Sequence, residues 1–262
     1  MPPALPILVS VRFSRSLGRV TRTRRRIYTL VLSHLVHQEA IMTQALAPDE
    51  LSKRYRALYT GAVSDVLDSL GLRQQALPHY IMPLTLDMVV AGPAFTGQGY
   101  PVSDIRNDDS DRRIRMLESI KPGTVSVWSS AGHFESAHWG EIMSNAARER
   151  GCTGAVVDGG LRDTRFVLKM GFPVFCRFRC SASSISRWEI REWMIPITIG
   201  DTVINPDDFV FGDCDGVVII PKALATEVLL KTEETVKREN GMRADLEKGI
   251  TVSEVYKKHG KF

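Results

Sequence analysis

The segment from Gly140 to Phe178 constrains the fold more than any other part of the chain, because helix and strand patterns alternate in it at short spacing. The helical pattern GEIMSNAARERG begins at Gly140, and the apolar run GAVVD after it predicts a buried strand. A second helix is predicted from about Asp163 to Met170, and the strand PVFCRF follows it. Such alternation predicts βαβ units and a parallel sheet, so we expect an α/β protein.

The remaining pattern adds elements to this core, with no internal repeat and no Pro- or Ser-rich linker. The charged stretch 104–115 is predicted to be an exposed loop leading into a short helix, and Gly159-Gly160 is predicted to be a turn. Residues 188–220 have strand character, and a long amphipathic helix is expected from Lys222 to about Lys248. Further predicted elements are helices from Pro48 to about Gly61 and from Ser64 or Asp65 to Gly71, and strands at 88–95 and 124–128.

The net charge of +4 belongs to the N-terminal segment. Residues 1–41 hold seven of the 34 basic residues and one of the 30 acidic residues, which leaves 27 and 29 in the rest, a net of −2. We expect residues 1–41 to be a basic, disordered extension and residues 42–262 to be one folded domain. A mitochondrial-type transit peptide and a nucleic-acid-binding arm are the alternatives for the extension.

The composition excludes several classes of protein. With 44% hydrophobic and 24% charged residues, the chain has the composition of an ordinary globular protein. No apolar run approaches the roughly 20 residues of a membrane-spanning helix. The four cysteines contain no CxxC pair, which indicates reduced thiols and no zinc site. We therefore expect a cytoplasmic protein with no membrane or nucleic-acid partner.

Two helix starts are the candidates for chemistry. At Gly140 the backbone can approach a ligand closely, and the amides of the first helical turn form an anion site. At 158–163 a buried strand leads through two glycines to Arg162 and Asp163, beyond the carboxyl end of the strand, where α/β sheets bind ligands. Arg162 could grip a carboxylate, and Asp163 could hold Mg²⁺ or Mn²⁺. The alternative is that Asp163 only caps its helix and pairs with Arg162 at the surface.

The sequence GEIMSNAARERGCTGAVVDGGLRD, with GFPVF after it and DCDGVVIIP later, resembles the family of the regulator of ribonuclease activity A, the RraA-like family. Its enzymatic members are metal-dependent 4-hydroxy-4-methyl-2-oxoglutarate aldolases that also decarboxylate oxaloacetate. The resemblance covers roughly residues 49–249. It implies that residues 42–262 form a catalytic domain with a single, swivelling β/β/α-type α/β fold and a long C-terminal helix. It also implies homotrimers or hexamers with sites between subunits.

The resemblance carries over to particular residues. Gly140, Glu141, Ile142 and Met143 match the segment whose helix-start amides bind the carboxylate of the substrate. Glu141 also matches an acidic position near the metal, and Arg162 matches the substrate-binding arginine, so these two are the expected catalytic residues.

Metal ligands follow from the same resemblance. Asp163 matches the direct ligand of a divalent cation, either Mg²⁺ or Mn²⁺. Glu239 is the best match to a residue that contacts the metal through water from a neighbouring subunit. Glu234 is a possible substitute for it, and an ordinary surface glutamate is the alternative for both.

The sequence departs from the family pattern at three places, which concern the substrate more than the metal site. Residues 128–133 replace a strand end rich in glycine and aspartate, Glu141 stands where well-known aldolases carry Asp, and 181–193 is distinctive.

Taken together, the resemblance implies a lyase, a class II pyruvate aldolase, that cleaves small oxo acids through a metal-stabilised pyruvate enolate and also decarboxylates oxaloacetate. A non-catalytic regulator of ribonuclease activity on the same fold is the alternative.

Overall fold

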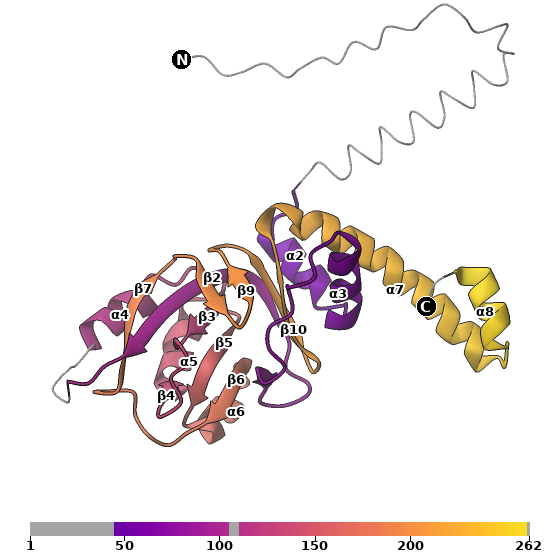
Figure 1. Ribbon diagram of the computed structural model, residues 1–262. Coiled ribbons are helices and arrows are strands. Elements are labelled where there is room, and N and C mark those ends of the chain that lie inside the picture. Colours follow the sequence, from indigo (N-terminus) through magenta and orange to yellow (C-terminus); the bar gives the residue numbers. More distant parts are fainter. Residues whose placement is uncertain (1–44, 105–109, 261–262) are drawn as a thin grey trace, which may run out of the picture. The chain divides into compact units, whose positions relative to one another are not determined.

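The computed structural model describes residues 45–104 and 110–260 of the chain (Figure 1). The basic extension predicted for residues 1–41 lies outside the described residues. From Ala45 on, the described residues belong to one compact unit. Among them, no helix is both long and apolar enough to span a membrane.

A nine-stranded mixed sheet forms the centre of this unit, with the order β1-β6-β5-β3-β2-β10-β11. Strands β2, β3, β5 and β6 run parallel, and β10, β11 and β1 are antiparallel to their neighbours. Strand β4 lies parallel to the end of β5, and β7 lies antiparallel to the second half of β2. The strands are β1 (Met82–Pro83), β2 (Val90–Pro101), β3 (Val125–Ser129), β4 (Ala137–Trp139), β5 (Gly154–Leu161), β6 (Val174–Arg179), β7 (Trp188–Trp193), β10 (Phe209–Asp213) and β11 (Gly216–Ile220), while β8 (Ile197–Ile199) pairs only with β9 (Thr202–Ile204).

The helices divide into two groups around the sheet. One group, α2, α3 and the start of α7, packs on β10 and β11 through an apolar core (Figure 1). The other group, α4, α5 and α6, packs on β3, β5 and β6. The helices are α2 (Pro48–Tyr55), α3 (Thr60–Ser69), α4 (Ser110–Glu118), α5 (Glu141–Glu149), α6 (Thr164–Met170), α7 (Ala225–Glu247) and α8 (Val252–His259), with the short 3₁₀ helix η1 (Lys222–Leu224) before α7.

Three tryptophans from different strands form the core between α5 and the sheet. The ring of Trp128 lies 5.2 Å from that of Trp139 and 5.6 Å from that of Trp188, measured between centroids. The indole N–H of Trp139 donates to Ser144 Oγ at 2.8 Å, so its polar end is satisfied inside the core. Such aromatic pairs add about 0.5–1.5 kcal/mol each beyond the area they bury. The end of β4 and the start of α5 are thereby held on a rigid base.

The predicted α/β class is confirmed, and so is its βαβ segment. Helix α5, strand β5, helix α6 and strand β6 follow one another as the pattern of 140–178 predicts. The strand character of 188–220 and the long C-terminal helix are also present, as β7 to β11 and α7.

The predicted turn at Gly159-Gly160 is wrong, because both glycines continue β5 to Leu161. Their role is close packing against β4. A Cβ on Gly159 would overlap the ring of His138, and one on Gly160 would lie 2.6 Å from the carbonyl oxygen of Ser136. The glycines therefore let two strands approach and do not reverse the chain.

The predicted ends of two helices in the N-terminal part of the described chain are also wrong. The predicted helix 48–61 ends at Tyr55, and Gly61 lies inside α3, which starts at Thr60. Asp213 sets that start, because its carboxylate accepts from the amide of Thr60 at 2.8 Å and from its hydroxyl at 2.7 Å.

Tertiary pairing explains two further differences. Strand β2 continues to Pro101 because β7 pairs with its second half, whereas the pattern predicted an end near Phe95. Helix α4 begins at Ser110, inside the predicted loop 104–115, and buries Met116 completely in the core. Most residues of this stretch are charged, so its sequence favours a loop, although the helix buries one face through Met116.

Candidate active site

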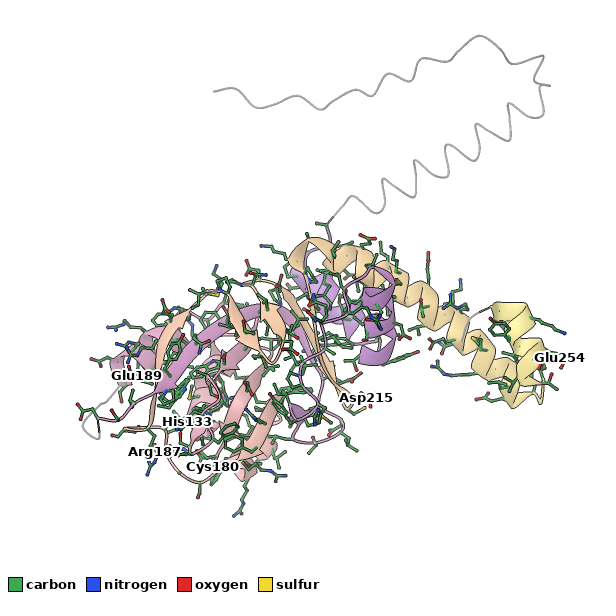
Figure 2. The ribbon with its side chains drawn as sticks, in the orientation of Figure 1. His133, Cys180, Arg187, Glu189, Asp215 and Glu254 are labelled. Carbon is green, nitrogen blue, oxygen red and sulfur yellow. The ribbon has the colours of Figure 1, made fainter. Side chains whose placement is uncertain are left out.

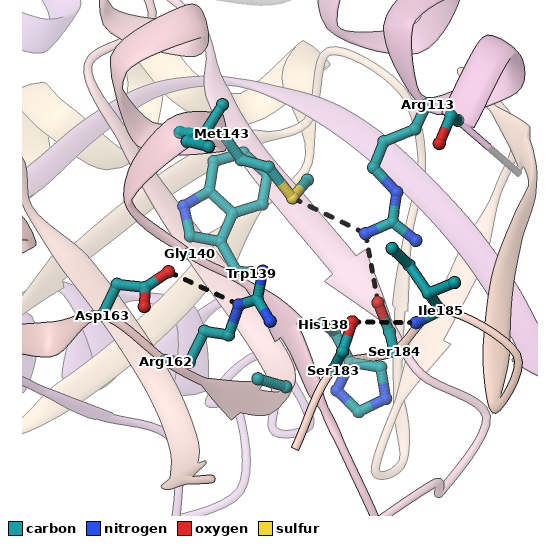
Figure 3. Close-up of a pocket in the computed structure, with 13 residues that line it drawn as sticks. Arg113, His138, Trp139, Gly140, Met143, Arg162, Asp163, Ser183, Ser184 and Ile185 are labelled. Atoms are coloured by element: carbon teal, nitrogen blue, oxygen red, sulfur yellow. Dashed lines mark hydrogen bonds and ion pairs between the residues drawn. The ribbon is translucent and has the colours of Figure 1, made fainter. Parts of the chain in front are cut away.

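A cavity of about 180 Å³ lies where the two predicted helix starts meet (Figure 3). Four segments line it: the end of β4 with the start of α5, the end of β5, helix α4, and the loop before β7. The volume is below the roughly 300–1,000 Å³ of pockets for drug-sized ligands, so the cavity suits a small molecule. The lining residues are Ser110, Arg113, 137–140, Ile142, Met143, Arg162, Asp163 and 183–185.

Asp163 has an unusual backbone conformation at the head of α6. Its φ of 57° and ψ of 26° lie in the left-handed region, which aspartate tolerates better than most non-glycine residues. Although Asp163 holds the N-cap position, its side chain makes no capping hydrogen bond. Its carboxylate instead lies 3.4 Å from Arg162 Nε, and both side chains are 41% exposed. The reading of Asp163 as an ordinary helix cap is therefore wrong, while the ion pair with Arg162 is present.

Gly140 allows this carboxylate to approach the start of α5. A Cβ at Gly140 would lie 3.0 Å from Asp163 Oδ2 and 3.4 Å from Arg162 Cγ. As the N-cap of α5, Gly140 also leaves the first-turn amides of the helix without a side-chain cap. These amides carry the positive end of the helix dipole, next to the guanidinium of Arg162. The local field therefore favours an anionic ligand.

A buried histidine pair supports the floor of the cavity. The amide of Gly160 donates to His138 Nδ1 at 2.9 Å, so the ring proton of His138 lies on Nε2 and donates to His133 Nδ1 at 3.0 Å. Burial, with His133 and Arg113 as further causes, lowers the pKa of His138 to about 3. His138 is thus neutral, and its hydrogen bonds to Gly160 and His133 give it a structural role.

The cavity brings together five of the predicted site residues and leaves out two. Gly140, Ile142, Met143, Arg162 and Asp163 all line it. Ile142 lies at its edge with 75% of the residue exposed.

Glu141 and Glu239 are the two that do not line the cavity. The carboxylate of Glu141 accepts from the side-chain amide of Asn145, one turn further along α5. Glu239 lies on α7, where it accepts from the hydroxyl of Tyr59 and, at 3.0 Å, from Arg243 Nη2. Its predicted role concerns a neighbouring subunit, so it stays a prediction.

Arg113 and the loop 183–185 line the cavity without having been identified from the sequence. Arg113 Nη1 donates to Ser184 Oγ at 3.2 Å and lies 3.9 Å from the sulfur of Met143. The spacing between Arg113 and Met116 could have indicated its position. Residues three apart lie on the same face of a helix, and Met116 is the buried residue of α4, so Arg113 lies on the face that points toward the rest of the protein. The serine loop carries no comparable signal, because no periodic pattern places it beside α5.

Within the described residues, three potential metal ligands come close together only at Asp213, Cys214 and Asp215. This group forms the turn between β10 and β11, well away from His133 (Figure 2). The carboxylate of Asp213 already binds Thr60 and also accepts from the amide of Asp215 at 3.0 Å. These contacts give the cluster a structural role, so Asp163 is the better candidate to hold a cation.

The sequence of this chain is similar to those of known proteins. Residues 60–219 match a family model described as RraA-like, Aldolase/RraA. A protein of Halalkalibacterium halodurans with the provisional name 4-hydroxy-4-methyl-2-oxoglutarate aldolase is 33% identical over 181 residues, which cover 69% of this chain and 81% of that protein.

Solved structures give two further likenesses. One, described as a crystal structure of novel cellulases from gut-associated microbes, is 38% identical, with a TM-score of 0.72 and coverage of 76% of this chain and 89% of that chain. Another, Streptomyces coelicolor RraAS2, is described as an unusual member of the RNase ES inhibitor RraA protein family. It is 27% identical, with a TM-score of 0.67 and coverage of 74% and 96%.

Proposed function

This chain belongs to the RraA-like family, and from that membership we propose that it is a carbon–carbon lyase. Its substrates are small 2-oxo acids of the 4-hydroxy-4-methyl-2-oxoglutarate type, which it cleaves to pyruvate, and it also decarboxylates oxaloacetate. The observation that carries the proposal is the carboxylate of Asp163, which caps no amide of its helix and lines the same cavity as Gly140 and Arg162.

Arg162 and the start of α5 are proposed to hold the 2-oxo acid. The guanidinium of Arg162 and the amides after Gly140 offer hydrogen-bond donors and positive charge on adjoining walls of the cavity. Such donors bind a carboxylate in its charged form and also stabilise the negative charge that develops on the keto oxygen when the neighbouring C–C bond breaks. The same groups therefore serve both binding and the transition state.

A divalent cation fits the carboxylate of Asp163. Mg²⁺ is commonly held by one or two carboxylates with water in its other positions, and Asp163 is a partly exposed carboxylate beside a cavity. When bound, a cation of this kind supplies Lewis-acid stabilisation of the enolate charge. Asp163 would be its ligand from this chain, and Glu239 of a second copy is the proposed outer contact.

His138 is not the proton acceptor, although it lines the cavity. Its pKa of about 3 makes it a weak base, and both of its ring nitrogens are already hydrogen-bonded. We therefore propose that a water molecule in the cavity transfers the proton. Glu141, in the first turn of α5, is the acidic side chain proposed to hold that water.

Two other functions are less well supported. Glycoside hydrolysis generally uses a pair of carboxylates, and Asp163 is the one carboxylate among the described residues that line this cavity. A non-catalytic regulator of ribonuclease activity has the support of one structural neighbour. It would have no need of Asp163, Arg162 and Gly140 in one cavity, and it predicts a change in ribonuclease cleavage rate on adding the protein.

The function is tested by pyruvate release from oxaloacetate and from 4-hydroxy-4-methyl-2-oxoglutarate, after EDTA treatment and with Mg²⁺ or Mn²⁺ added back. Asp163→Ala is expected to lower kcat/KM at least ~100-fold, because it removes the cation ligand. The matched control is Asp215→Ala, which removes an exposed carboxylate at the β10–β11 turn. Absence of pyruvate with the wild-type protein, or equal rates for the two variants, would contradict the proposal.

A further inference from the structure

Arg113 brings a second guanidinium into the cavity, from a wall other than the one that carries Arg162. Figure 3 shows Arg113 extending from α4 and Arg162 from the end of β5 into the same space. Arg113 Nη1 lies at hydrogen-bond distance, 3.2 Å, from Ser184 Oγ, and both residues line the cavity. Arg162 and the α5 amides are the proposed site of one carboxylate, and Arg113 lines the cavity on another wall, so it would face a different group of the same ligand.

The surroundings of Arg113 are held in place from both sides. Its helix is fixed to β7, because Arg112 Nη1 donates to the carbonyl oxygen of Ile190 at 3.1 Å. Its partner Ser184 is buried, and the carbonyl oxygen of Ser184 accepts from the amides of Arg187 at 2.9 Å and Trp188 at 2.8 Å. A guanidinium held against a fixed hydroxyl loses little freedom on binding, which favours recognition of a particular ligand group.

The wall between the two arginines is apolar. Met143 lies beside Arg113, and Trp139 lies between α5 and the end of β5, so this part of the cavity suits a short carbon chain and not a further charge (Figure 3). A ligand that fits the whole cavity therefore has an anionic group at each end and a small hydrocarbon spacer.

We propose that Arg113, positioned by Ser184, binds the second carboxylate of a dicarboxylic 2-oxo acid and so selects dicarboxylic over monocarboxylic substrates. This inference rests on the proposed function for the identity of the reaction, but the binding preference can be measured without turnover. Arg113 contacts the far end of the substrate, so it acts on affinity and not on the bond that breaks.

Binding is tested first, by calorimetric titration of the full chain, with Mg²⁺ present, with 2-oxoglutarate and with 2-oxopentanoate, which has a methyl group in place of the far carboxylate. The wild-type protein is expected to bind 2-oxoglutarate at least ~10-fold more tightly. Arg113→Leu is expected to abolish the difference, and Arg113→Lys to retain part of it, because lysine keeps the charge but not the fork of donors. The control is Arg115→Leu, an exposed arginine on the same helix.

Turnover gives the second readout. With 4-hydroxy-4-methyl-2-oxoglutarate and its analogue 4-hydroxy-4-methyl-2-oxopentanoate, Arg113→Leu is expected to raise KM about 10–100-fold for the first and less than twofold for the second. Equal affinity of the wild-type protein for both titrants, no binding of either, or an unchanged substrate ratio in Arg113→Leu would overturn the inference. A preserved binding preference without pyruvate release would instead overturn the proposed reaction and leave the role of Arg113 intact.

Discussion

At the scale of residues, the cavity is lined by side chains from segments that lie far apart in the chain. Arg162, Asp163 and Gly140 stand at a strand end and at helix starts, so local pattern marks them as candidates, and their roles come from the family resemblance. Arg113 and Ser184 come from segments that are separate in the chain, and they meet only because α4 and the loop before β7 fold over α5. Periodicity reports which face of an element is buried, but not which other element faces it.

The pH dependence of stability is a prediction at this scale, and it concerns His138. In the folded protein the pKa of His138 is about 3, below its ordinary value of 6.5. Between these two pH values the imidazole is protonated in the unfolded chain but not in the folded protein. The stabilisation is fully present above about pH 6.5 and is lost as the pH falls toward 3. Over that range we expect the free energy of unfolding to drop by a few kcal/mol, on the order of 1.4 per unit of pKa shift.

Urea unfolding at a series of pH values measures this. In His138→Gln the part of the slope between pH 6.5 and 4 that comes from the imidazole should disappear, while the slope from the carboxylates at lower pH remains. An identical pH profile in both proteins would contradict the assignment.

At the scale of elements, the type of each central element could be predicted, but many ends could not. The alternation in 140–178 predicts α5, β5, α6 and β6 because the signals are local: α5 repeats its buried residues with the helical period, and β5 is a continuous run that is buried along its whole length. The end of β5 is set by β4 beside it, and the start of α3 by a carboxylate from the β10–β11 turn. Such ends depend on contacts distant in sequence, which no local pattern contains.

The start of α3 yields a prediction about stability. Asp213→Ala removes two hydrogen bonds to Thr60 and leaves a buried amide without its acceptor, so it should lower the free energy of unfolding by about 1–3 kcal/mol. Asp215→Ala, at the exposed position of the same turn, should change it by less than about 0.5 kcal/mol. Denaturant titration distinguishes the two, and EDTA should alter neither result. Equal losses in both variants would argue against this anchor.

At the scale of the whole molecule, the cavity and the C-terminal helix belong to different parts of the unit. Helix α7 packs on α2 and α3, and beyond them it contacts α8, whereas the cavity is built from β4, β5, α4 and α5 (Figure 1). Glu239 therefore serves the cavity only if a second copy supplies it, as the family resemblance implies.

Subunit complementation tests this arrangement. Asp163→Ala and Glu239→Ala are each expected to be impaired alone, but their co-expression should restore part of the pyruvate release, because some hybrid sites combine an intact Asp163 with an intact Glu239. Two differently tagged copies of Asp163→Ala, co-expressed, provide the control and should stay inactive. Full activity of Glu239→Ala alone, or hybrids that form without recovering activity, would contradict a shared site.

The left-handed backbone at Asp163 also restricts the mutational routes open to this position. Glycine, asparagine and aspartate adopt that conformation at little cost, whereas β-branched and bulky side chains do so poorly. A change to asparagine would remove the charge while leaving the backbone undisturbed. The carboxylate of Asp163 can therefore be lost by substitution without unfolding the protein. On this fold, a single substitution at this position would be enough to convert a metal-dependent lyase into a non-catalytic protein.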